Sequence, residues 1–140
     1  MQDTIEREIL ISAPIERVWE IVTTPEHMGQ WFGDAGAERH GDVINMSWKE
    51  HGTAELRIVQ EDAPNRFAFR WDANDPGIGD TLVEFTFTPE GSGTRLRVVE
   101  SGWGELRTSP ERQAELRDGN TGGWKHELGD LERYAQTVTV

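Results

Sequence analysis

The C-terminal segment, residues 109–136, constrains the fold of this chain more than any other feature. It begins at Ser109-Pro110-Glu111, a capping residue followed by proline, and continues with helix-forming residues. At about 100° per residue, one face collects Leu116, Asn120, Trp124, Glu127, Leu128, Leu131, Tyr134 and Ala135. The segment therefore predicts one long amphipathic helix, which we expect to be locally weak or bent near Gly122-Gly123 because glycine is a poor helix former.

The rest of the chain predicts strands and two short helices. Residues 4–11 alternate between apolar and charged side chains, as in a half-buried strand, and short helices follow after Pro14 and after Thr24-Pro25. From residue 34 the apolar period becomes two, which indicates five further strands around Ile44–Trp48, Leu56–Ile58 and residues 66–71, 81–88 and 94–101. Tight turns between them predict an antiparallel meander. The expected fold class is α+β, a curved antiparallel sheet wrapped around the long C-terminal helix, in a single domain over residues 1–140.

Composition excludes several functions. Twenty-six acidic residues against fourteen basic ones give a net charge of −12, and the basic residues are scattered, which argues against nucleic acid and anionic membrane as partners. The absence of cysteine removes disulfides and thiolate metal sites. His27, His40, His51 and His126 have no metal-ligand spacing, and no cofactor fingerprint is present. With no secretory signal and no apolar run near 20 residues, a cytoplasmic location is expected.

The order of these elements resembles the helix-grip fold of the START-like, or SRPBCC, superfamily. Local sequence is similar to the group named after the activator of the ninety-kilodalton heat-shock protein's ATPase. The matching landmarks are residues 13–19 (APIERVW), Thr24-Pro25-Glu26, Trp31-Phe32, Arg70-Trp71, Thr94-Arg95-Leu96, Glu100-Ser101-Gly102-Trp103, Gly123-Trp124, Leu128 and Leu131. The resemblance covers nearly the whole chain, and it is the order and spacing of the landmarks that carries it.

The resemblance implies a cavity between the sheet and the long helix that takes hydrophobic or amphipathic ligands, and some members of the superfamily are cyclases or aromatases acting on polyketides. The co-chaperone that names the group has an additional N-terminal domain that engages the chaperone. Because nothing precedes the first strand here, activation of a chaperone ATPase is not expected.

Inward-facing aromatic residues are the candidate ligand contacts. A curved sheet and one helix do not close perfectly on each other, so rings at the open end either fill the gap as core or line a pocket. The candidates are Trp31, Trp48, Phe69, Trp71, Phe85, Trp103 and Trp124. Ordinary core is the favoured interpretation of any one of them, and as a set they favour a pocket.

Two glutamates are predicted to face the same interior. Glu100 continues the alternation of Leu96 and Val98, and Glu127 lies on the apolar face of the last helix. A buried carboxyl is costly unless it is paired, so either residue could orient or protonate a ligand. The competing interpretations are that Glu100 lies at the wet end of its strand, or that Arg7 pairs with one of the two.

Three functions remain open at the level of sequence. The first is binding, by sequestration or carriage, of a small hydrophobic or aromatic molecule without a cofactor. The second is an enzyme of the cyclase, aromatase or hydrolase kind that uses Glu100 or Glu127 as acid or base. The third is a stress-related protein-interaction module, which would need an exposed apolar patch of several hundred Å². Neither the identity of the ligand nor the oligomeric state follows from the sequence.

Overall fold

A computed structural model describes residues 2–50, 52–72 and 77–138. The chain runs β1 (Thr4–Ile11), α1 (Ile15–Thr23), α2 (Pro25–Trp31), β2 (Ala37–His40), β3 (Val43–Trp48), β4 (Gly52–Asp62), β5 (Arg66–Trp71), β6 (Thr81–Glu90), β7 (Gly93–Ser101), η1 (Trp103–Glu105) and α3 (Pro110–Val138). The expected fold class, with two short helices after the first strand and a long helix at the end, is confirmed.

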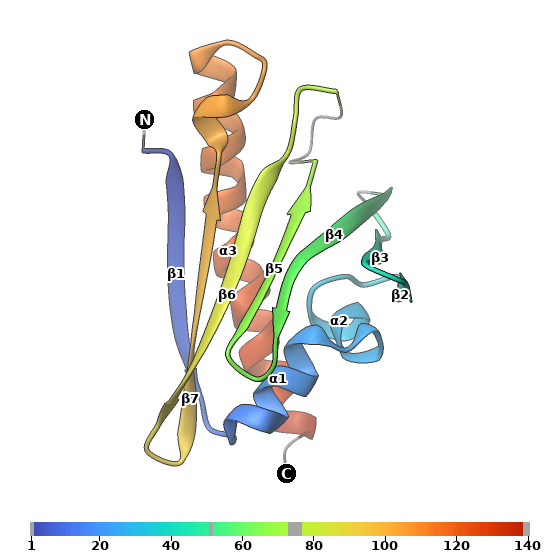
Figure 1. Cartoon of the computed structure of the whole chain (residues 1–140), viewed down its shortest axis with the longest axis vertical. Helices are drawn as coiled ribbons and strands as arrows, with labels where there is room; N and C mark the ends of the chain where they lie inside the picture. Colours follow the sequence, from blue (N-terminus) through green and yellow to red (C-terminus); the bar gives the residue numbers. More distant parts are fainter. Residues whose placement is uncertain (1, 51, 73–76, 139–140) are drawn as a thin grey trace.

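All seven strands form one antiparallel sheet in the order β1-β7-β6-β5-β4-β3-β2. The long helix α3 runs along one face of this curved sheet, and α1 and α2 lie near the C-terminal end of α3 (Figure 1). The sequence missed β2, because its four residues are almost entirely exposed and polar and show no apolar alternation. The sheet therefore has one strand more than the pattern predicted.

The helix α3 forms where the apolar stripe predicted it. Its first turn is capped by Ser109, whose Oγ accepts a hydrogen bond from the backbone N–H of Arg112 at 3.1 Å. The helix is continuous through Gly122 and Gly123, and the local weakness or bend expected at these two residues stays a prediction. Burial of Leu116, Leu128 and Leu131 against the sheet and α2 stabilises the helix and offsets the low helix propensity of its glycines.

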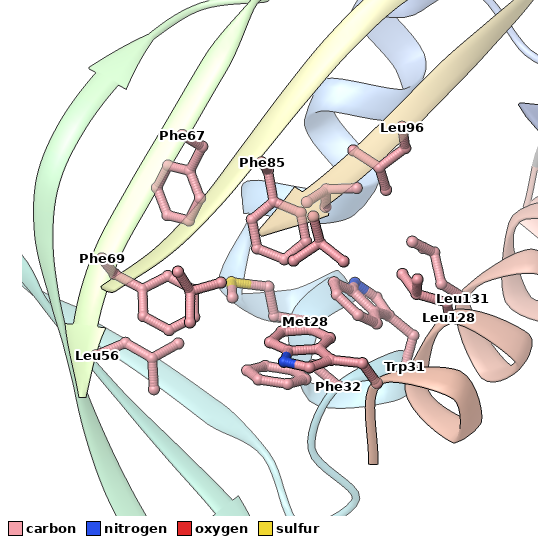
Figure 2. Close-up of a cluster of buried hydrophobic side chains, with 14 of the residues drawn as sticks. Met28, Trp31, Phe32, Leu56, Phe67, Phe69, Phe85, Leu96, Leu128 and Leu131 are labelled. Carbon is pink, nitrogen blue, oxygen red and sulfur yellow. The ribbon is translucent and has the colours of Figure 1, made fainter. Parts of the chain in front are cut away.

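The core lies between the concave face of the sheet and the helices. Phe67, Phe69 and Phe85 project from β5 and β6 toward Met28, Trp31 and Phe32 of the α2 region and toward Leu128 and Leu131 of α3 (Figure 2). Each of these side chains is buried. Leu56 of β4 belongs to the same core, and Ala54 packs against it.

Candidate functional site

A cavity of about 620 Å³ lies between strands β3 to β5 and the middle of α3. Its floor is made of buried or half-buried residues, namely Phe32, Trp48, Ala54, Trp71, Asn120, Trp124 and Glu127. Its rim is made of exposed residues, namely Thr53, Glu55, Arg57, Asp72, Gly119 and Gly123. A volume of this size falls within the range of small-molecule sites.

The backbone explains why this space is open. Pairing between β4 and β5 extends only from Asp62↔Arg66 to Arg57↔Arg70, so residues 52–56 of β4 pair with β3 alone. On the opposite wall, α3 presents Gly119 and Gly123, and a Cβ added to either would meet no atom within 4 Å. The two glycines therefore keep side chains out of the cavity, at a cost of about 1 kcal/mol each relative to alanine.

Aromatic rings form most of the floor. Phe32 stacks on Trp124 with ring centroids 5.5 Å apart and planes 10° apart, and it also lies 5.5 Å from the ring of Trp71. Trp48 lies 6.3 Å from Trp71 and donates its indole N–H to the carbonyl oxygen of Phe32 at 2.8 Å. The four rings thus form one continuous surface that is held at several points.

Glu100 lies behind this floor and anchors it. Its side chain is fully buried, and its two carboxylate oxygens accept four hydrogen bonds. Oε2 accepts from Trp71 Nε1 at 2.7 Å and Thr81 Oγ1 at 2.5 Å, while Oε1 accepts from Trp124 Nε1 at 2.8 Å and Asn120 Nδ2 at 3.2 Å. Four donors match the acceptor capacity of a carboxylate. Glu100 therefore fixes two indoles and an amide of the cavity wall.

Glu127 differs from Glu100 in both position and partners. It lies on the floor of the cavity and is half-buried, and its carboxyl makes no hydrogen bond or ion pair with any residue in the described part of the chain. Burial, reinforced by the negative charges of Asp130 and Asp34, raises the pKa of Glu127 to about 8. At neutral pH this carboxyl is mostly protonated and can donate a hydrogen bond into the cavity.

The structure separates the residues that the sequence singled out. It brings Trp48, Trp71, Trp124 and Glu127 together at the cavity. It places Trp31, Phe69, Phe85 and Trp103 in the buried core, away from the lining, and Glu100 one layer behind the floor. Arg7 is exposed and is not among the partners of Glu100, so the predicted pairing of Arg7 with an inward carboxyl is wrong.

Sequence reasoning missed three floor residues, Phe32, Ala54 and Asn120. Phe32 caps the end of α2 and turns into the cavity, whereas Trp31 beside it turns into the core, and periodicity does not resolve two adjacent residues at a helix end. Asn120 could have been found, because a polar residue on the apolar face of the last helix is the same signal that identified Glu127. The glycines at 119 and 123, one helical turn apart, were a further sign of space beside α3.

Metal-ligating groups are not gathered in the part of the chain that the structure describes, where no three His, Asp or Glu side chains converge as a metal site would require. His51, named among the four histidines, lies outside the described residues. Within the same described ranges, no helix is long and apolar enough to cross a bilayer.

Comparison with models of known protein families identifies the family of this chain. The model of the family described as "Activator of Hsp90 ATPase homolog 1-like protein" matches residues 12–136. The chain belongs to this family. The match covers every element except β1 and the last residues of α3, which agrees with the resemblance in sequence order noted above.

Solved structures share the fold of this Hsp90-activator-like family member along most of its length. Protein MLL2253 from Mesorhizobium loti is 25% identical with a TM-score of 0.78, and the match covers 96% of this chain and 97% of that one. The Aha1 dimer from Colwellia psychrerythraea is 17% identical with a TM-score of 0.75, covering 94% of each chain. DynU16, a protein of the dynemicin biosynthetic locus, is 26% identical with a TM-score of 0.77. The match covers 98% of this chain and 48% of DynU16, so the chain spans about half of that protein's length. Comparison with curated proteins gave no match.

Proposed function

We propose that this protein binds a small molecule with an aromatic or apolar body in the cavity between β4 and α3. The observation that supports this most directly is a space of about 620 Å³ floored by four aromatic rings, with the carboxyl of Glu127, which has no hydrogen-bond or ion-pair partner among the described residues. A cavity lined mostly by apolar rings with few polar groups is the usual form of a small-molecule site. The rings supply affinity, and Glu127 orients the ligand.

The arrangement around Glu100 also supports binding. A fully buried carboxylate that accepts three of its four hydrogen bonds from residues of the cavity wall, Trp71, Asn120 and Trp124, stabilises the shape of that wall as well as the interior packing. A preformed wall lowers the ordering cost of binding, because the indoles are already immobilised before the ligand arrives. The empty space is thus maintained by polar interactions that a simple packing defect would not have.

Filling the cavity from α3 tests the proposal. Gly123→Leu should place its side chain in the cavity and weaken binding of the neutral probe N-phenyl-1-naphthylamine by about tenfold or more. Gly122→Leu is the matched control, since Gly122 is exposed, does not line the cavity and also has open space around its Cβ position. Both variants gain helix propensity, so a loss of affinity would not reflect unfolding.

Probe fluorescence titrations measure the affinities, and native mass spectrometry of protein purified from its own host checks for a co-purified ligand. Equal affinity of the two leucine variants would contradict the location of the site. A wild-type protein that binds no apolar probe and carries no small molecule would overturn the proposed function.

A second candidate function is general acid catalysis on a polyketide-like substrate. The specific observation that favours it is Glu127, a carboxyl in the cavity whose pKa of about 8 suits proton transfer near neutral pH. Glu100 is the weaker of the two glutamates for this role, because four protein donors occupy its oxygens and it does not line the cavity.

Turnover separates an enzyme from a binder. If Glu127 is the acid, Glu127→Gln should lower kcat on a cyclisable aromatic polyketide analogue by about 10²-fold to 10⁴-fold while the affinity changes little. Product formation by liquid chromatography and affinity by calorimetry measure the two effects. Glu132→Gln, at an exposed position of the same helix outside the cavity lining, is the control. Undiminished turnover in Glu127→Gln would rule out this role.

The protein-interaction alternative gains no support from the surface of the described residues. The large hydrophobic side chains exposed there are Leu10, 45% exposed on β1, and Val59, 55% exposed on β4. The strands β7, β6 and β5 separate them in the sheet, so they do not form one patch. A docking face of several hundred Å² would need more apolar area than two separated side chains provide.

A further inference from the structure

The charge around the cavity is predominantly negative. The carboxyls of Glu55 and Asp72 lie on the rim and that of Glu127 lies on the floor, whereas Arg57 is the one basic residue among the described lining residues. Arg57 is already engaged, since its guanidinium donates to the carboxylate of Asp80. The net charge of −12 adds a long-range field of the same sign. A positively charged ligand would therefore be attracted to the mouth.

The surroundings of Glu127 are also short of positive charge. Asp34 and Asp130 are the two carboxylates that act on it. Asp130 forms an ion pair with Arg133, whose side chain is 69% exposed on the outer side of the helix. Asp34 accepts a hydrogen bond from the backbone N–H of Lys49 at 2.7 Å. No side chain of the described residues offers Glu127 a cation. A positively charged group of a ligand could therefore form an ion pair with Glu127.

The aromatic floor offers rings rather than hydrogen-bond donors. The indole N–H of Trp48 is used by the carbonyl of Phe32, and those of Trp71 and Trp124 are used by Glu100. An anionic ligand would therefore find none of these three donors available. The negatively polarised ring faces remain, and they attract an ammonium group through cation–π interactions.

We propose that the ligand of this cavity is a small organic cation, an amine or quaternary ammonium with an aromatic or apolar body. This inference rests on the proposed binding function and narrows its ligand class. The positive group lies against the aromatic floor within reach of Glu127, and the apolar body extends along the rings of Phe32 and Trp124. The competing prediction is an anion that binds Arg57 in place of Asp80.

Three probes that share a naphthylmethyl body and differ in the charge of their polar group test the ligand class. They are (1-naphthylmethyl)trimethylammonium, 1-naphthylmethanol and 1-naphthylacetate, whose dissociation constants are measured by calorimetry at low salt. We expect the cation to bind about tenfold more tightly than the neutral alcohol, and the anion to bind most weakly. Equal affinity of cation and alcohol would overturn the cation proposal and leave the binding function standing. Tightest binding by the anion would overturn it in favour of Arg57. Failure of all three probes would overturn both.

Affinities measured over a range of pH, together with one variant, test whether Glu127 is the residue that binds the positive group. The quaternary ammonium keeps its charge at every pH, so its affinity should rise between pH 6 and pH 9 as Glu127 ionises, whereas that of the alcohol should not. Other charged groups near Glu127 are Glu55, Arg57 and Asp72, which line the cavity, and Asp34 and Asp130, which act on its carboxyl; Asp130 is paired with His126 and Arg133.

Glu127→Gln should abolish the rise and reduce the affinity of the cation about tenfold at pH 9. Glu132→Gln removes the same formal charge from an exposed site of the same helix and should retain the rise. A rise that persists in Glu127→Gln would overturn the assignment of Glu127 as the partner of the cation.

Discussion

Replacing Glu100 by glutamine is expected to destabilise the protein by about 2–4 kcal/mol, although the two side chains have nearly the same shape. The carboxylate accepts hydrogen bonds from Trp71 and Thr81 on one oxygen and from Asn120 and Trp124 on the other. In glutamine one oxygen becomes an NH₂ group, which faces two N–H donors at the Oε1 position and the N–H of Trp71 at the Oε2 position, where only the Thr81 hydroxyl can turn to accept. Each unsatisfied buried polar group costs about 1–3 kcal/mol.

Urea denaturation measures this loss, and near-ultraviolet circular dichroism reports whether Trp71 and Trp124 lose their fixed environment. Glu105→Gln is the matched control, because Glu105 is exposed in η1 and its side chain makes no hydrogen bond or ion pair within the described ranges. Its free energy of unfolding should change by less than about 0.5 kcal/mol. A change equally small for Glu100→Gln would show that the four hydrogen bonds contribute little to stability.

The fold could be predicted from the sequence because the strand alternation and the apolar stripe of the helix are local patterns that repeat over several residues. The alternation in β1, β5, β6 and β7 and the stripe along α3 each involve several residues, so a single exception does not obscure them. β2 has only four residues, nearly all exposed, and therefore left no such pattern. Its place is set by hydrogen bonds to β3, from Ala37↔Met46 to His40↔Val43, which are invisible until β3 is in position.

The cavity was predictable only in part, because it depends on which rings fail to meet. Trp48 and Phe69 were equal candidates from alternation, yet Phe69 is fully buried and Trp48 lies at the cavity. What distinguishes them is the point where β4 separates from β5, beyond the pair Arg57↔Arg70. That separation is a property of the sheet as a whole. Likewise both glutamates were correctly placed facing inward, but only their surroundings distinguish Glu100, which supports the wall, from Glu127, which lines the cavity.

Glu127→Gln should have the opposite sign to Glu100→Gln, stabilising the protein in a way that depends on pH. The pKa of Glu127 is raised from 4.5 to about 8 by burial and by the charges of Asp130 and Asp34. Between these values the unfolded chain releases the proton while the folded chain retains it, so the wild-type stability falls as pH increases from about 4.5 to about 8. Glutamine cannot ionise, so the variant should not lose stability for this reason.

Unfolding free energies from urea titrations at pH 5.5, 7 and 8.5 measure the difference between wild type and variant. The difference should be small at pH 5.5 and reach about 2–3 kcal/mol in favour of Glu127→Gln at pH 8.5. The acidic residues in salt bridges do not change the stability between pH 5.5 and pH 8.5. The pKa values of Glu61 and Glu90 are lowered by hydrogen bonds to Arg39 and Arg95, so their contribution is lost only as the pH falls below about 4.5.

Glu132→Gln controls for the change in net charge and should give no pH-dependent gain. If the gain at pH 8.5 were absent in Glu127→Gln, the ionised carboxyl would have to be stabilised by groups outside the described residues. The cavity would then be no better suited to a cation than to a neutral ligand. A gain that disappears when the naphthyl ammonium probe is added would instead link the two properties. The cation would then provide the positive charge that Glu127 lacks among the described residues. The stability of the protein and its affinity for the cation would change over the same pH range.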